Sequence, residues 1–196
     1  MKAIDESELA AAQANVRMAA AIAAAEGDLY KVALSDEVYE AATELVFPDD
    51  ILVRDSWFKG TPEFIQKARL KKLTINDPKT VLPSRYFQDL RAEEIEIPYG
   101  TLLFSNQLFH RSSVKKVRIT PGSGDPGGGY GSEMFGDCKN LQEVVFEEGV
   151  EFVSYGMFYN CTALRSVRLP STMRSIWKNA FIDCEALEDI TLPDGI

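Results

Sequence analysis

The chain has 196 residues, of which 45% are hydrophobic and 26% are charged, a balance that fits a folded domain and excludes a largely disordered chain. Its formal net charge of −9 argues against nucleic acid or an anionic membrane as the main partner, since both attract basic surfaces. No run reaches the roughly 18 consecutive apolar residues of a membrane span, so we expect no membrane insertion.

Residues 1–27 predict a helix that forms a segment of its own. Eleven of them are alanine, the best helix former, and Gly27 is a suitable stop. Asp5, Glu6 and Glu8 lie where the helix dipole favours negative charge, and they replace the basic leader of a secretion signal, so we expect no such signal. The helix either caps the core that follows or serves in docking and oligomerisation through its small side chains. A thin apolar stripe runs along it, formed by Leu9, Ala12, Val16, Ala19, Ala20 and Ala23.

One apolar pattern recurs through residues 28–196 at steps of 22 to 28 residues. The pattern is apolar-x-x-apolar-x-apolar, which fits one short strand, and its spacing is typical of leucine-rich repeats. We therefore expect an α/β leucine-rich-repeat solenoid of about seven short coils with one parallel sheet, preceded by the capping helix. The seven expected strands contain Ala42-Leu45-Phe47, Leu70-Leu73-Ile75, Ala92-Ile95-Ile97, Val114-Val117-Ile119, Leu141-Val144-Phe146, Leu164-Val167-Leu169 and Leu187-Ile190-Leu192.

The repeat is most regular over residues 134–196, where its period is 23 residues. Each copy carries a phenylalanine, a cysteine and a leucine at fixed positions, which predicts one supersecondary unit that packs on its neighbours. We expect the phenylalanines to stack on the wall opposite the sheet and the cysteines to be buried structural thiols. The members of the two columns are Phe58, Phe87, Phe109, Phe135, Phe158 and Phe181, and Cys138, Cys161 and Cys184.

Two steps between strands are longer than the others. The first contains residues 59–69, which we interpret as a surface elaboration. The second contains the glycine-rich loop 122–131, which matches G-x-G-x-x-G after an expected strand. Nucleotide binding also needs a helix that begins there, and Pro126 with the following glycines denies one, so we expect a flexible loop and no cofactor.

The sequence offers no set of residues for catalysis or metal binding. His110 is the only histidine, it has no acid or nucleophile at a fixed spacing, and we interpret it as a surface residue. The cysteines are too far apart for a metal site. We therefore expect a protein that is not an enzyme.

The exposed face of the expected sheet is the natural binding surface of a solenoid. The outward residues form two columns, and the first column alternates in charge over five strands. Opposite charges on adjacent strands favour pairing of those strands in register. The charges either only fix this register or also bind a partner. The first column is Glu44, Lys72, Glu94, Lys116, Glu143, Ser166 and Asp189, and the second column is Val46, Thr74, Glu96, Arg118, Val145, Arg168 and Thr191. From them we take as candidate protein-binding residues Lys72, Thr74, Glu94, Glu96, Lys116, Arg118, Glu143, Val145, Arg168 and Thr191.

The run Phe158-Tyr-Asn-Cys161-x-x-Leu164-x-x-Val167-x-Leu169-Pro170 resembles the BspA-like leucine-rich repeats, whose units read roughly AF-x-x-C-x-x-L-x-x-I-x-L-P. The resemblance is closest over 134–196, looser over 80–120 and faint before residue 80. Members of that family are often microbial surface adhesins, so the resemblance implies a non-catalytic protein-binding scaffold at a cell or virion surface, with a protein partner.

A structural component of a larger assembly, such as a phage tail or capsid appendage, is the alternative, docked through the N-terminal helix and the open end of the solenoid. Ile196 falls midway through a repeat, so we expect a solenoid cut within its eighth coil. An uncapped end of this kind favours self-association.

Overall fold

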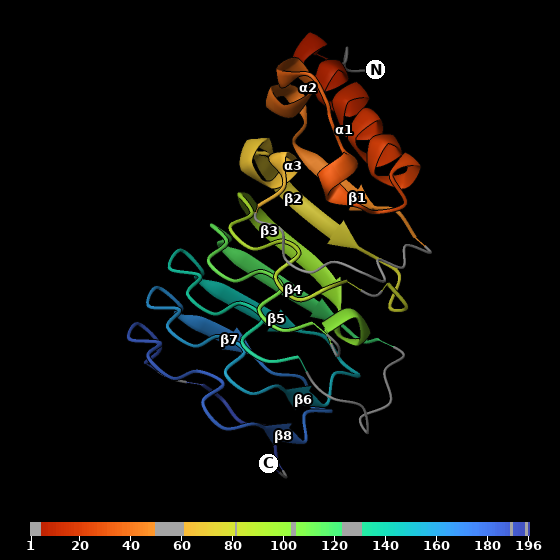
Figure 1. Cartoon of the computed structure of the whole chain (residues 1–196). Helices are drawn as coiled ribbons and strands as arrows, with labels where there is room; N and C mark the ends of the chain where they lie inside the picture. Colours follow the sequence, from red (N-terminus) through yellow and green to blue (C-terminus); the bar gives the residue numbers. More distant parts are fainter. Residues whose placement is uncertain are drawn as a thin grey trace.

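A computed structural model describes residues 5–49, 61–80, 82–102, 105–122, 131–188, 190–194 and 196. Figure 1 shows successive repeats stacked one on another, with their main strands side by side in one sheet. Helices α1 and α2 lie at the end of the stack that begins with β1, and the C-terminus lies at the other end. The predicted leucine-rich-repeat solenoid with its N-terminal helix is confirmed.

The described helical elements lie within the first 102 residues, and every element described after Leu102 is a short strand. They are α1 (Glu6–Ala24), η1 (Leu29–Lys31), α2 (Asp36–Ala41), β1 (Glu44–Phe47), α3 (Glu63–Lys67), β2 (Leu70–Ile75), β3 (Ala92–Pro98), η2 (Tyr99–Leu102), β4 (Lys116–Thr120), β5 (Glu143–Phe146), β6 (Phe152–Val153), β7 (Ser166–Arg168) and β8 (Ser175–Ile176).

Six parallel strands form the main sheet in the order β1-β2-β3-β4-β5-β7, and β6 pairs with β8 in a second, two-stranded sheet. Six of the seven expected strands are therefore present. The seventh is not: among the described residues of 187–192 none is in a strand, and Thr191 and Leu192 are both exposed. The alternation of buried and exposed side chains that holds a strand in register is missing there.

The wall opposite the sheet is built around a column of parallel phenylalanine rings. Successive rings lie 5.1 to 5.6 Å apart with interplanar angles of 3° to 8°. Edge-on contacts from Phe47 to Phe87 and from Phe146 to Phe158 join this column to the sheet. Each ring that is fully buried contributes about 1.5–3 kcal/mol relative to exposure. The stacked rings are Phe87, Phe109, Phe135, Phe158 and Phe181, as predicted, and Phe58 lies outside the described residues.

Backbone hydrogen bonds tie the same wall together from coil to coil. The backbone N–H groups of Phe109, Phe135 and Phe158 each donate to a carbonyl of the next coil at 2.9 Å. In the coils from residue 85 onward, the chain reaches this geometry through two left-handed positions four residues apart, such as Glu133 (φ 56°) and Asp137 (φ 59°). Asparagine, aspartate and glycine tolerate that conformation best, and they occupy most of these positions.

The three cysteines form the predicted column of buried thiols. Cys138, Cys161 and Cys184 each direct Sγ at the carbonyl of the phenylalanine one coil earlier, at 3.3, 3.1 and 3.2 Å. Ser112 takes the same position in its coil, and its hydroxyl donates to the carbonyl of Phe109 at 2.7 Å. None of the cysteines is in a disulfide. The thiol is a second donor to each carbonyl, because backbone N–H groups such as that of Cys138 on Phe135 also bond there.

Helix α1 packs beside α2 and β1, and its Asn15 side chain pairs with the open edge of the sheet. Its Oδ1 accepts hydrogen bonds from the backbone N–H groups of Thr43 (2.9 Å) and Glu44 (3.0 Å). In the next coil, the equivalent N–H groups of Lys71 and Lys72 donate to one backbone carbonyl, that of Thr43. Asn15 thus replaces the carbonyl that a preceding coil would supply, and it shields an edge that would otherwise be open to another strand.

The helix buries a different face from the apolar stripe of the sequence, and one expectation about the second coil is wrong. The helix buries Ala14, Met18 and Ile22, whereas Leu9 and Val16 of the stripe are exposed. The longer Met18 and Ile22 fill more of the space above the first coil than the alanines of the stripe. The described part of 59–69 is no surface elaboration, since α3 carries two side chains, at positions 64 and 65, that are almost completely buried.

Replacement of Asn15 by alanine is expected to lower the free energy of unfolding by about 1–3 kcal/mol, because two backbone N–H groups lose their acceptor. Alanine is the better helix former, so helix propensity cannot cause a loss. Urea unfolding of Asn15→Ala beside Gln13→Ala, an exposed neighbour in the same helix, measures the difference. Equal stabilities of the two variants would contradict the edge-capping role.

Candidate functional site: the exposed face of the sheet

The register of the sheet assembles both predicted columns. Glu44, Lys72, Glu94, Lys116, Glu143 and Ser166 are successive partners across the six strands. Val46, Thr74, Glu96, Arg118, Val145 and Arg168 form the second row of partners in the same way. Of the seventh-strand members, Asp189 lies outside the described residues, and Thr191 is not in the sheet.

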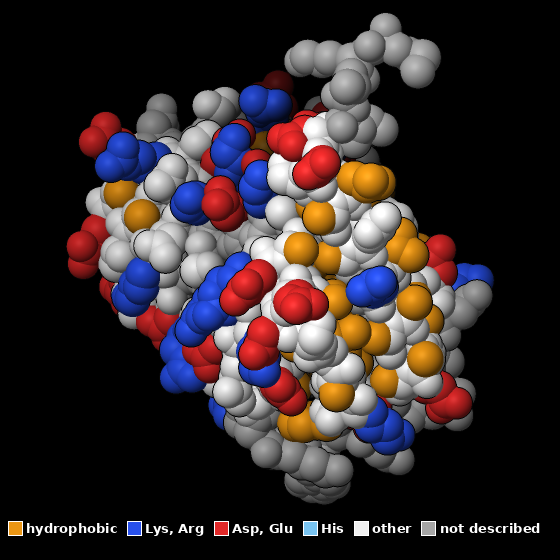
Figure 2. Space-filling view, turned by 90° about the horizontal axis from the view of Figure 1, so that it is seen from above, with side chains coloured by type: hydrophobic (Ala, Val, Ile, Leu, Met, Phe, Trp, Pro, Cys, Tyr) orange, Lys and Arg blue, Asp and Glu red, His pale blue; other side chains and the backbone are white. Residues whose placement is uncertain are grey.

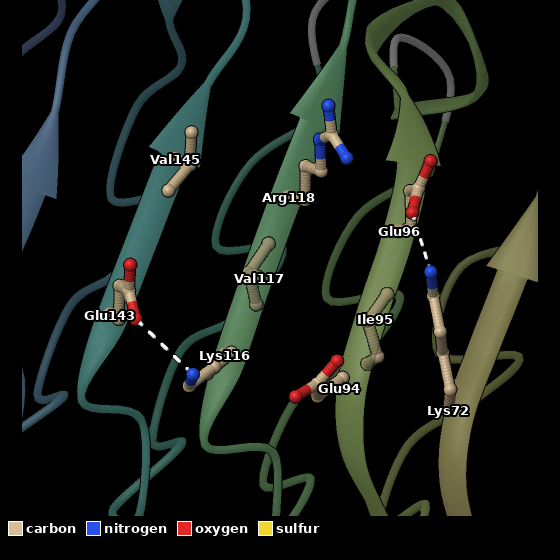
Figure 3. A pocket seen from close by; sticks show the side chains of 9 residues that line it. All are labelled: Lys72, Glu94, Ile95, Glu96, Lys116, Val117, Arg118, Glu143 and Val145. Atoms are coloured by element: carbon tan, nitrogen blue, oxygen red, sulfur yellow. Dashed lines mark hydrogen bonds and ion pairs between the residues drawn. The ribbon is translucent and has the colours of Figure 1, made fainter.

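A hollow of about 220 Å³ lies on this face over β2 to β5. Figure 3 shows its charged side chains standing on the strands, with Ile95 and Val117 between them along β3 and β4. Seven of the ten candidate residues line it, and Thr74 and Arg168 do not, although both lie in the same column of the sheet. The lining residues are Lys72, Glu94, Ile95, Glu96, Lys116, Val117, Arg118, Glu143 and Val145.

The charges of the face pair differently from the in-register ladder that the alternation predicts. Lys116 does pair in register with Glu143, at 3.6 Å, but Lys72 reaches diagonally to Glu96, at 2.7 Å. Arg118 donates through Nε to Glu147 at 2.8 Å, beyond the end of the neighbouring strand. Long side chains reach diagonal neighbours as readily as direct ones, which strand register alone does not reveal.

This pairing leaves Glu94 without a cation. Within the described ranges no Lys or Arg nitrogen pairs with its carboxylate, although it lines the hollow between Lys72 and Lys116. The hollow and its rim hold three cations, on Lys72, Lys116 and Arg118, and four carboxylates once Glu147 is included. One negative charge remains, that of Glu94.

The hollow is small and is lined mostly by charged side chains. Its volume lies below the roughly 300–1,000 Å³ of small-molecule pockets. In the part of the chain that the structure describes, no three His, Cys, Asp or Glu side chains gather as a metal site would require. The described helices also include none with the length and apolar character of a membrane span.

His110 lies on the opposite wall and, contrary to expectation, is mostly buried. Its side chain is 12% exposed, stacks on the ring of Tyr159 and places Nε2 3.6 Å from Asp137. Burial lowers the pKa of His110 below its ordinary value, against the opposing effect of Asp137. Burial also raises the pKa of Asp137, but hydrogen bonds from Tyr159 and Asn160 outweigh it and hold that pKa below the ordinary value.

The sequence does carry a signal for this cluster that a search by motif misses. Gly136 occupies the position of His110 one coil later, and a Cβ there would lie 2.1 Å from the ring of Tyr159. The glycine makes room for that ring, which can then reach across to the histidine. Burial raises the pKa of all three cysteines of the neighbouring column, that of Cys184 to about 11.

The stacked coils, the parallel sheet and its exposed charged face define a leucine-rich-repeat solenoid. A family model described as the BspA type leucine rich repeat region matches residues 60–124 and 130–196, in six copies. The chain belongs to this family. The match begins at residue 60 and so includes the second coil, where the sequence resemblance is faint.

Two solved structures are similar to this chain. A leucine-rich repeat protein from Eubacterium ventriosum is 25% identical with a TM-score of 0.58, over 79% of this chain and 40% of its own. One from Bacteroides ovatus is 21% identical with a TM-score of 0.56, over 78% of this chain and 37% of its own. This chain therefore spans about two fifths of either protein. The search of curated proteins gave no match.

Replacement of Lys116 by glutamate is expected to lower the free energy of unfolding by about 1 kcal/mol, because the new carboxylate lies in register between Glu94 and Glu143. Thermal unfolding at low salt measures the loss. High salt should reduce it, since salt screens exposed charges. An unchanged melting temperature at low salt would show that these charges contribute nothing to register.

The protein is expected to lose stability as the pH falls through about 6.5, the ordinary pKa of histidine. Because burial lowers the pKa of His110, the unfolded chain binds the proton more readily than the folded chain, and stability rises with pH. As His110 is the only histidine, urea unfolding of His110→Gln between pH 7.5 and 5.5 should show a shallower loss than the wild type. Parallel curves for the two proteins would contradict this assignment.

Proposed function

We propose that this chain is a non-catalytic protein-binding module whose contact surface is the exposed face of the main sheet. The observation that supports it is the hollow over β2 to β5, where Glu94 has no ion-pair partner among the described residues and Arg118 pairs with Glu147 through Nε. Solenoids offer extended surfaces of this kind to protein partners. Membership of the BspA type leucine-rich repeat family agrees with a role in protein interaction.

The arrangement of the face favours a partner that presents charged groups of both signs. A cationic side chain would find Glu94, and a carboxylate would find the guanidinium of Arg118 or the exposed Arg168. Charge-assisted hydrogen bonds of this type are stronger than neutral ones. Val145 supplies an apolar contact between them. An adhesin-like role is the specific form of this proposal, and none of the observations favours the alternative of a component of a larger assembly.

A photo-reactive benzoylphenylalanine placed at Val145 tests the proposal, with the same residue at Ile182 as control. Ile182 is an exposed apolar residue on the opposite wall, so it is matched in chemistry but faces elsewhere. The two variants are irradiated in an extract of the organism that makes the protein. The Val145 probe should then form crosslinks to discrete partner proteins that the Ile182 probe does not. Glu94→Lys and Arg118→Glu should each reduce that capture by about tenfold, a change equivalent to 1.4 kcal/mol. Identical products from both probes, or none from Val145, would overturn the proposal.

A further inference from the structure

Helix α1 has a second apolar face, which points away from the solenoid. Leu9 is 51% exposed and Val16 is 69% exposed. Ala12, Ala20 and Ala23 are exposed on the same side, opposite the buried Ala14, Met18 and Ile22. α1 lies at the upper end of the molecule in Figure 1. Figure 2 views the molecule from that end and shows hydrophobic side chains gathered on one part of the surface, with charged side chains around them.

Two charges of opposite sign flank this face. Glu6 and Arg17 are both exposed, and neither forms an ion pair with any residue in the described ranges. They are eleven residues apart, which is about three turns of helix, so they lie on the same flank. In an antiparallel pair of identical helices, residues of one flank meet the same flank of the other helix. Glu6 of each copy would then lie level with Arg17 of the other, and the two ion pairs would form together.

The apolar side chains independently favour the same register. When Glu6 and Arg17 are level across the pair, Leu9 of one helix falls between Ala12 and Val16 of the other. In this arrangement the leucine side chain packs into the gap between two residues that are four positions apart on the other helix. The small alanine side chain allows the two backbones to lie close together. A parallel pair would instead place Glu6 level with Glu6 and Arg17 level with Arg17. Charge and packing therefore agree on one antiparallel arrangement.

We propose that the outer face of α1, formed by Leu9, Ala12, Val16, Ala20 and Ala23, binds the same face of a second copy of this chain in an antiparallel pair. Glu6 and Arg17 set the register. A contact between two single helices lies at the small end of protein interfaces, so the dimer should be in exchange with the monomer. The proposal does not depend on the proposed function, because it leaves the sheet face free.

Sedimentation equilibrium of the full chain tests the proposal. The apparent mass should rise from 21.8 kDa toward twice that value as the concentration is raised to about 500 μM, a range that suits a small interface. Leu9→Glu and Val16→Glu should each raise the dissociation constant by at least about tenfold, while circular dichroism shows the helix intact. Leu192→Glu is the matched control, since Leu192 is also 51% exposed but lies at the C-terminal end. It should leave association unchanged.

A charge exchange separates this pairing from other modes of association. Glu6→Lys and Arg17→Glu should each weaken the dimer about tenfold, and the double variant should restore it, because each ion pair is then re-formed with its signs reversed. A wild-type chain that stays monomeric at 500 μM would overturn the proposal. So would association that is lost in Leu192→Glu but kept in Leu9→Glu, which would place the contact at the C-terminal end of the solenoid.

Discussion

The stacking of each coil on the next is the constraint from which the rest of this structure follows. One ring, one small donor and one strand recur in every regular coil, so a single spacing serves the phenylalanine column, the cysteine column and the sheet. The rings supply apolar burial, and the thiols pair with carbonyls that the core encloses. A single repeat on its own can form neither the ring stack nor the thiol–carbonyl contacts. The stability of a solenoid therefore depends on contacts between neighbouring repeats.

The same stacking determines which side chains are exposed on the sheet face and at the first coil. Because register is fixed from the inside, the side chains that alternate outward are held in rows, and Glu94 remains over the hollow even though no cation pairs with it. At the first coil the stack has no preceding coil, and Asn15 supplies the acceptor that this edge lacks. The helix that brings Asn15 into place then carries a second apolar face outward. Because one face of α1 covers the first coil, the opposite apolar face of the helix is left exposed.

The sequence predicts the repeated parts of this fold well and the unique parts poorly. Period and phase place the strands and the phenylalanine column, since each copy confirms the others. They do not tell which face of α1 is buried, because that helix has no repeats for comparison and both of its faces are apolar. Nor do they show that Lys72 reaches Glu96 rather than Glu94, a choice made by side-chain length and angle. The left-handed positions at Asp137 and Asn160 do leave a trace, as a recurring preference for Asp and Asn at one phase.

Native-state hydrogen exchange of the backbone amides tests the stacking most directly. The amide groups of Phe109, Phe135 and Phe158 on the opposite wall should be protected to the same degree as those of Val117 and Val144 in the sheet, within about 1 kcal/mol, because both walls open only when the coils separate. Wall amides that exchange as fast as exposed turns, while the sheet stays protected, would show that the sheet alone holds the protein together and that the columns are incidental.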